Sequence, residues 1–132
     1  MGHSPHRSSG GTFVRDFAGI RVWALRRALD SGNATIALAE ARELDFVGLT
    51  DALELVLLLV DEPGKFRRAA LRWHARYCAE VPDVGFGEAD AVLACLEGLA
   101  GRRPKAAAGA LAELVHRRGL EWASELLIRW AG

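Results

Sequence analysis

Apolar residues recur every three or four positions through most of the chain after residue 12. Phe13, Phe17 and Ile20 begin one such stripe, and Leu96 and Leu99 end another. This spacing places apolar side chains on one face of an α-helix. The sequence contains no alternating apolar and polar run flanked by hairpin turns, so no β-sheet is expected. The pattern predicts an all-α protein of about seven helices.

Glycine and proline divide this pattern into segments. Gly32 and Gly119 follow apolar stripes, where a helix commonly ends. Pro63 and Pro104 stand where the first turn of a helix accepts proline. These signals predict helical hairpins over residues 13–45, 50–81 and 86–118 and a terminal helix over residues 120–131.

The ends of the chain differ in character. Residues 1–12 are rich in Gly, Ser and His, and we expect a disordered lead there. Residues 13–132 suffice for one all-α domain with its own core. The apolar run of residues 53–60 is too short to span a bilayer, and no signal peptide is visible. We therefore expect a cytoplasmic protein that does not contact a membrane.

Composition narrows the classes of partner. The 132 residues include 17 Lys and Arg and 17 Asp and Glu, so the formal net charge is zero. That balance argues against electrostatic attraction to nucleic acid as the main mode of action. The abundance of Arg, Ala and Gly is typical of a GC-rich bacterial genome. Two cysteines, Cys78 and Cys95, do not form a disulfide framework and fit a reducing cytoplasm.

An internal repeat is visible at the helix junctions. A glycine is followed five positions later by an alanine, at Gly32/Ala37, Gly64/Ala69 and Gly101/Ala106. The glycine permits a left-handed residue between two antiparallel helices, and the small alanine lets those helices approach closely. This recurrence predicts stacked helix–turn–helix units.

The middle unit carries a family resemblance. Gly64, Phe66, Ala69 and Trp73 occupy the positions of the turn glycine, the two aromatics and the small contact residue of tetratricopeptide repeats, units of about 34 residues. Pro82 lies one place from the closing proline of that family. The chain resembles a degenerate tetratricopeptide-like array over roughly residues 20–118. The resemblance implies an α-hairpin repeat array that binds other proteins.

The first helices of the units depart from that family. The middle unit has Leu53, Val56, Leu57 and Val60 where the family has tryptophan, glycine and tyrosine. We therefore do not infer a peptide-binding groove of the family's kind from the resemblance. A compact orthogonal helical bundle is the alternative architecture.

The segment from Pro63 to Glu80 has two distinct faces at 100° per residue. Phe66, Trp73 and Tyr77 share the apolar face. The opposite face carries Lys65, Arg68, Arg72 and Arg76. Because nucleic-acid readers interleave aromatic and basic side chains on one exposed face, this separation favours a solvated helix face, or else an acidic protein partner, over nucleic acid.

Histidine and cysteine residues offer a weak zinc hypothesis. His74 and Cys78 lie four apart on one helix, while Cys95 and His116 lie on later helices. A Cys₂His₂ site from these four would need three helices to converge, and their spacing matches no compact zinc module. No nucleophile motif or phosphate-binding loop is present. We therefore expect no metal, no cofactor and no enzymatic activity.

The last helix carries two tryptophans. Trp122 and Trp130 lie eight apart, near the apolar face of Leu126 and Leu127. They either complete the packing of a terminal helix or form an apolar anchor for a partner.

Together these features predict a non-catalytic protein–protein interaction or adaptor module that acts through stacked helix surfaces. Its partner would be another protein or a second copy of the chain. One alternative is a nucleic-acid-associated regulator that adds Arg102, Arg103, Arg117 and Arg118 to the basic face. Another is a small-molecule pocket lined by Trp73 and Tyr77.

Overall fold

The computed structural model describes residues 19–132, in which all regular secondary structure is helical. This confirms the all-α prediction. No helix in that range has both the length and the apolar character needed to cross a bilayer. The predicted disordered lead of residues 1–12 lies outside the described residues. Contacts group the chain into two compact units, residues 1–47 and residues 48–132. The single domain expected over residues 13–132 stays a prediction.

The described part of the first unit is a helical hairpin. Residues 19–31 are helical, and the chain reverses at Gly32, whose φ of 74° is readily adopted only by glycine. Helix α2 (Ala34–Arg42) begins after Asn33, whose side-chain oxygen accepts a hydrogen bond from the Ile36 N–H at 3.0 Å. The sequence signal at Gly32 thus coincides with a real helix end.

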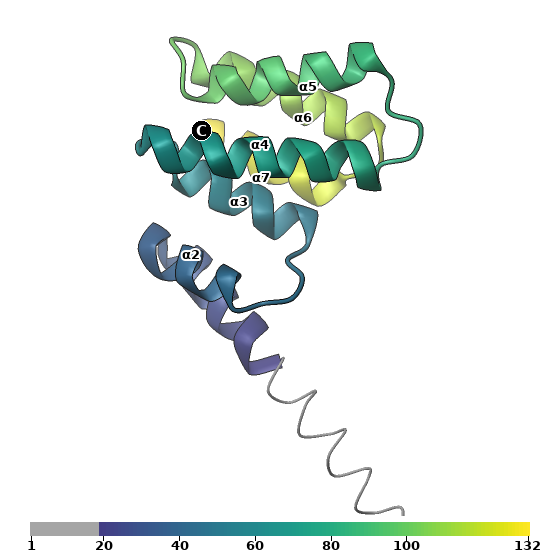
Figure 1. Ribbon diagram of the computed structural model, residues 1–132. Coiled ribbons are helices and arrows are strands. Elements are labelled where there is room, and N and C mark those ends of the chain that lie inside the picture. The colour runs from purple at the N-terminus through teal and green to yellow at the C-terminus, as the bar shows by residue number, and fades with distance from the viewer. Residues whose placement is uncertain (1–18) are drawn as a thin grey trace, which may run out of the picture. The chain divides into compact units, whose positions relative to one another are not determined.

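The second unit contains five helices. They are α3 (Leu49–Leu58), α4 (Pro63–Glu80), α5 (Phe86–Leu99), α6 (Pro104–Arg117) and α7 (Glu121–Ala131). Each packs against the next in the chain, so α3 with α4 and α5 with α6 form hairpins. Helix α7 packs against α6 and also returns to contact α3 (Figure 1). The first and last helices of this unit therefore touch.

Local sequence explains where these helices begin and end. Pro63 and Pro104 are the first residues of α4 and α6, where a missing N–H has no cost. Gly119 ends α6 with a φ of 81°. The Leu120 N–H donates to the Val115 carbonyl at 2.9 Å, which closes a Schellman turn.

The core of the second unit is built around α4. Trp73 and Tyr77 are fully buried, and their ring centroids lie 5.4 Å apart. The Trp73 indole N–H donates to the Leu49 carbonyl oxygen at 2.8 Å, which fixes α4 against the start of α3. The other helices supply buried aliphatic side chains, among them Leu53, Val56, Val92, Leu96, Leu99, Leu111, Val115 and Leu127.

Helices α5 and α6 approach each other unusually closely at Gly98. A Cβ atom at this position would lie 2.8 Å from the Ala107 Cβ, well inside van der Waals contact. Glycine is therefore required by the packing distance of this hairpin and not by its backbone angles.

Candidate functional site

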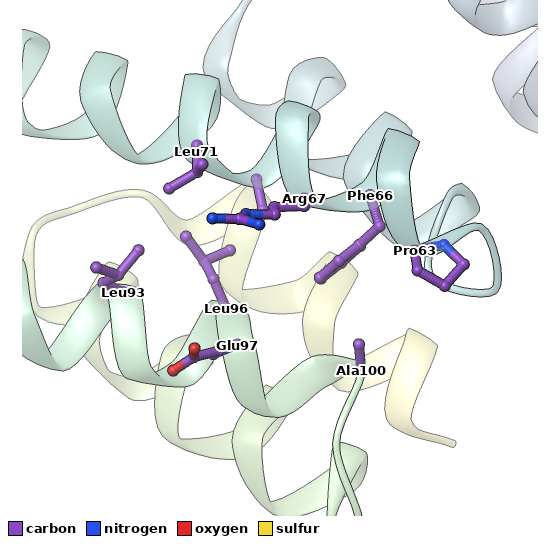
Figure 2. A pocket seen from close by; sticks show the side chains of 9 residues that line it. Pro63, Phe66, Arg67, Leu71, Leu93, Leu96, Glu97 and Ala100 are labelled. Atoms are coloured by element: carbon purple, nitrogen blue, oxygen red, sulfur yellow. The ribbon is translucent and has the colours of Figure 1, made fainter.

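A groove lies between α4 and α5. The two helices are antiparallel and are joined by the short turn of residues 81–85 (Figure 1). Near the start of α4 their surfaces enclose a groove of about 560 Å³ (Figure 2). Buried Phe66, Ala70 and Leu96 line it, so its base is apolar.

The walls of the groove expose further apolar side chains. Leu71 on α4 is 47% exposed and Leu93 on α5 is 36% exposed. Phe86, at the first position of α5, is 92% exposed. It lies seven residues before Leu93, which places it on the same side of α5. An apolar surface therefore follows α5 beyond the groove itself.

Opposite charges stand on the two walls. Arg67 projects from α4 and Glu97 from α5, and both side chains line the groove (Figure 2). Among the described residues neither forms an ion pair. The groove thus combines an apolar base with one cation and one anion that are left for other contacts.

The predicted basic face of α4 lies away from this groove. Lys65 Nζ lies 3.3 Å from a Glu62 carboxylate oxygen, and Arg76 donates to Glu80 at 2.8 Å. Only Arg68 and Arg72 extend from the face without an acidic neighbour within the described part of the chain. Two of the four predicted cations are therefore balanced by their own helix, which weakens the positive field of this face.

The two tryptophans of α7 differ in exposure. The Trp122 side chain is 77% exposed, whereas Trp130 is only partly accessible. At helical spacing they lie about 80° apart around α7. Trp122 is thus the one that offers most of its ring to a partner.

The four candidate zinc ligands are only partly brought together. His74 Nε2 lies 2.8 Å from the Ala89 carbonyl oxygen and 3.8 Å from Cys78 Sγ. The imidazole N–H is therefore engaged with the α5 backbone. Cys95 is partly buried, which raises the pKa of its thiol, and His116 is exposed on α6. Residues 19–132 contain no group of three or more His, Cys, Asp or Glu side chains arranged around a possible metal position.

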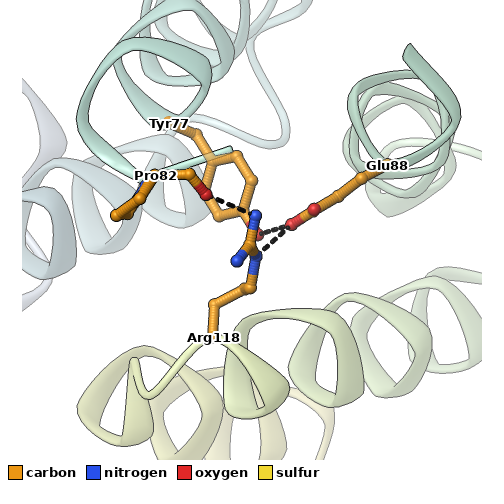
Figure 3. A network of polar contacts seen from close by, with 4 residues as sticks. All are labelled: Tyr77, Pro82, Glu88 and Arg118. Carbon is orange, nitrogen blue, oxygen red and sulfur yellow. Dashed lines mark hydrogen bonds and ion pairs between the residues drawn. The ribbon is translucent and has the colours of Figure 1, made fainter. Parts of the chain in front are cut away.

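A polar cluster at the other end of α4, which the sequence did not predict, joins three helices (Figure 3). The Tyr77 hydroxyl donates to Glu88 Oε2 at 2.7 Å, and Arg118 Nε donates to the same oxygen at 2.9 Å. Arg118 Nη2 also donates to the Pro82 carbonyl oxygen at 2.6 Å. We call these four residues the clamp, because they join α4, α5 and the end of α6. A buried tyrosine in an apolar stripe was the available signal, since its hydroxyl needs a partner.

Electrostatics keep the clamp in one protonation state. The hydrogen bond from Arg118, followed by that from Tyr77, lowers the pKa of Glu88. Burial, followed by the hydrogen bond to Glu88, raises the pKa of Tyr77 well above its ordinary value. Glu88 is therefore ionised and Tyr77 protonated at neutral pH, so each keeps its role as acceptor or donor.

Two alternative functions, the small-molecule pocket and the nucleic-acid regulator, depended on residues that the structure places in the core and the clamp. Trp73 and Tyr77 fill the core, and their polar atoms bond to Leu49 and Glu88, so they do not line the groove. Arg118, one of the arginines of the nucleic-acid alternative, is engaged by Glu88 and Pro82.

Protein-family models, curated proteins and solved structures were each compared with the chain, and none of them matches it. The tetratricopeptide-like resemblance therefore stays a prediction that rests on the sequence positions alone. What the described geometry offers is an apolar groove with charged walls, an arrangement suited to non-covalent binding.

Proposed function

We propose that this protein is a non-catalytic interaction module and that the α4/α5 groove binds a partner protein. The observation that carries the proposal is the exposure of Leu71 and Leu93 on facing walls above an apolar base. Covering such a surface gains about 25 cal/mol for each Å² of apolar area removed from water. Contiguous exposed apolar surface of this kind is typical of binding sites.

The shape of the groove favours a helical partner. Partner helices packed over two antiparallel helices can insert side chains from successive turns into the space between them. Arg67 and Glu97 would then meet acidic and basic side chains of the partner helices. Such charges select the partner and its orientation more than they add to affinity.

Neighbouring surfaces support an adaptor role. Arg68 and Arg72 lie on another side of α4 and fit an acidic partner surface. Trp122 offers an exposed aromatic anchor on α7. We place this activity in a bacterial cytoplasm, which the composition and the two free cysteines favour. The tetratricopeptide-like positions around Gly64 agree with binding through stacked helices.

Quantitative co-purification tests the proposal. Tagged wild-type protein is compared with Leu71→Glu and Leu93→Glu in cells of the source organism, and untagged copies of the chain are counted among the recovered proteins. We expect both groove variants to lose the bound partner. Ile128→Glu, at a 60% exposed position on α7, is the matched control and should retain it. Recovery of the same proteins by all four baits would overturn the proposal.

A further inference from the structure

We propose that the face of α4 and α5 that carries the groove packs against the same face of a second copy, in a two-fold symmetric dimer. The inference rests on the proposed function of the groove and names its partner. Four helices, α4 and α5 from each copy, would form the interface.

The two walls carry the same kinds of residue in opposite chain order. On α4, Arg67 is followed four residues later by Leu71. On α5, Leu93 is followed four residues later by Glu97. Because the helices are antiparallel, Arg67 and Glu97 share one level of the groove, and Leu71 and Leu93 share the next (Figure 2). The groove therefore has a charged level and an apolar level.

A two-fold axis running along the groove makes this surface complementary to itself. The rotation places α4 of one copy over α5 of the other at the same level. Arg67 then faces Glu97 of the second copy, and Leu71 faces Leu93 of the second copy. Each contact occurs twice, so both charges find opposite charges and both exposed leucines are covered.

The alternative axis, across the helices, is disfavoured by the same charges. It would place α4 over α4 and bring Arg67 toward its own copy, where like charges repel. Both axes make every neighbouring pair of helices antiparallel, so helix dipoles do not distinguish them and the charges decide.

The arrangement also accounts for Phe86. This residue is 92% exposed and follows the same side of α5 as Leu93. In the dimer, α5 lies along α4 of the second copy, so the Phe86 ring would rest on the C-terminal half of that helix. An otherwise uncovered aromatic side chain would become an interface residue.

Charge reversal at Arg67 and Glu97 gives a sharp test. Sedimentation equilibrium should show a dimer for the full wild-type chain. Arg67→Glu alone and Glu97→Arg alone should each weaken dimerisation by about tenfold or more, because each creates two like-charge contacts. An equimolar mixture of these two variants should regain the dimer mass, because both pairs are then opposite in charge. The doubly reversed chain, Arg67→Glu with Glu97→Arg, should also dimerise.

Matched folding controls keep the test decisive. Circular dichroism spectra should be unchanged in both single variants, since neither residue is paired within the described chain. Recovery of the dimer by mixing cannot arise from a folding defect. A wild-type chain that is monomeric in sedimentation equilibrium, or a mixture that stays monomeric, overturns the inference.

The outcome is separable from that of the proposed function. If the wild-type chain is monomeric but Leu71→Glu loses a different protein in co-purification, the groove binds a partner that is not a second copy. If dimerisation is unaffected by all charge reversals and by Leu71→Glu, the dimer uses another surface and the inference fails.

Discussion

The two ends of the α4/α5 pair are finished in opposite ways. Where α4 ends and α5 begins, Tyr77, Glu88 and Arg118 satisfy one another through the clamp. From the start of α4 and the end of α5 an open groove runs toward the middle of the pair, where Leu71 and Leu93 stay exposed on its walls. The same two helices thus carry a satisfied polar cluster at one end and an open apolar groove over the other half.

This difference separates folding from binding. Polar groups that are taken from water must find partners within the chain, because an unsatisfied buried group costs about 1–3 kcal/mol. Exposed apolar groups impose no such demand on the folded chain and gain most when a partner covers them. Substitutions in the polar cluster should therefore change stability, and those in the groove should change association.

The largest expected effect contrasts two neighbours on α4. Trp73→Ala removes a fully buried indole and should cost about 3–5 kcal/mol of unfolding free energy. Leu71→Ala, at a 47% exposed position, should change stability by about 0.5 kcal/mol or less. Urea denaturation of the two variants, at a protein concentration low enough for the chain to be monomeric, measures both values. Equal losses would contradict the assignment of the two faces.

A second contrast concerns two glycines of the α5–α6 hairpin, one at the helix contact and one in open space. Gly98→Ala would place a Cβ atom 2.8 Å from the Ala107 Cβ, and we expect a loss of about 1–3 kcal/mol as the hairpin shifts. Gly109→Ala, within α6, meets nothing within 4 Å and should stabilise the protein by about 0.5–1 kcal/mol through helix propensity. Thermal unfolding distinguishes the signs. Stabilisation by both alanines would show that α5 and α6 do not approach so closely.

A smaller effect is expected when the clamp loses its hydroxyl. Tyr77→Phe keeps the buried ring but leaves Glu88 with one donor fewer, and should cost about 1 kcal/mol. Chemical denaturation measures the loss. A double-mutant cycle with Glu88→Ala, which removes the acceptor, should show that the two substitutions are not additive. Additive effects would mean that the 2.7 Å hydrogen bond contributes nothing to stability.

The smallest expected effect is a pH dependence. The pKa of Glu88 is lowered in the folded protein from its ordinary value of 4.5, so its stabilisation is fully present above that value. It is lost as the pH falls through the lowered pKa of the folded state. Because the Glu88 and Arg118 side chains are 23% and 27% exposed, water screens the pair, and Glu88→Gln should lower the melting temperature at pH 7 by only a few degrees.

Melting curves of both proteins across acidic pH check this expectation. The difference between the two melting temperatures should begin to shrink as the pH falls below 4.5 and should vanish below the lowered pKa of Glu88 in the folded protein, where the wild-type carboxylate is protonated. A constant difference at every pH would show that the ionised form of Glu88 has no special role.

The sequence predicted the elements better than the surfaces. Pro63 and Pro104 mark helix starts, and Gly119 marks a helix end, because proline and glycine act on the local backbone. Trp73 was placed in the core because helical periodicity alone determines which face of α4 is apolar.

Neither the groove nor the clamp could be predicted in the same way. Arg118 and Glu88 are 30 residues apart, and their contact depends on how α6 ends beside α5. Leu71 and Leu93 lie at the edges of their apolar stripes, so only the pairing of α4 with α5 decides whether they flank one groove. These features belong to tertiary packing, which a one-dimensional pattern does not encode.

The return of α7 to α3 has a consequence for cooperativity. In an open stack of repeats each unit contacts only its neighbours, so the end units can melt first while the rest persists. Here α7, the last helix of the second unit, packs against α3, the first helix of the same unit, so melting either helix removes contacts from the other. Residues 48–132 should therefore unfold in a single transition, and formation of the α3–α7 contact should come late in folding, because it closes the longest loop.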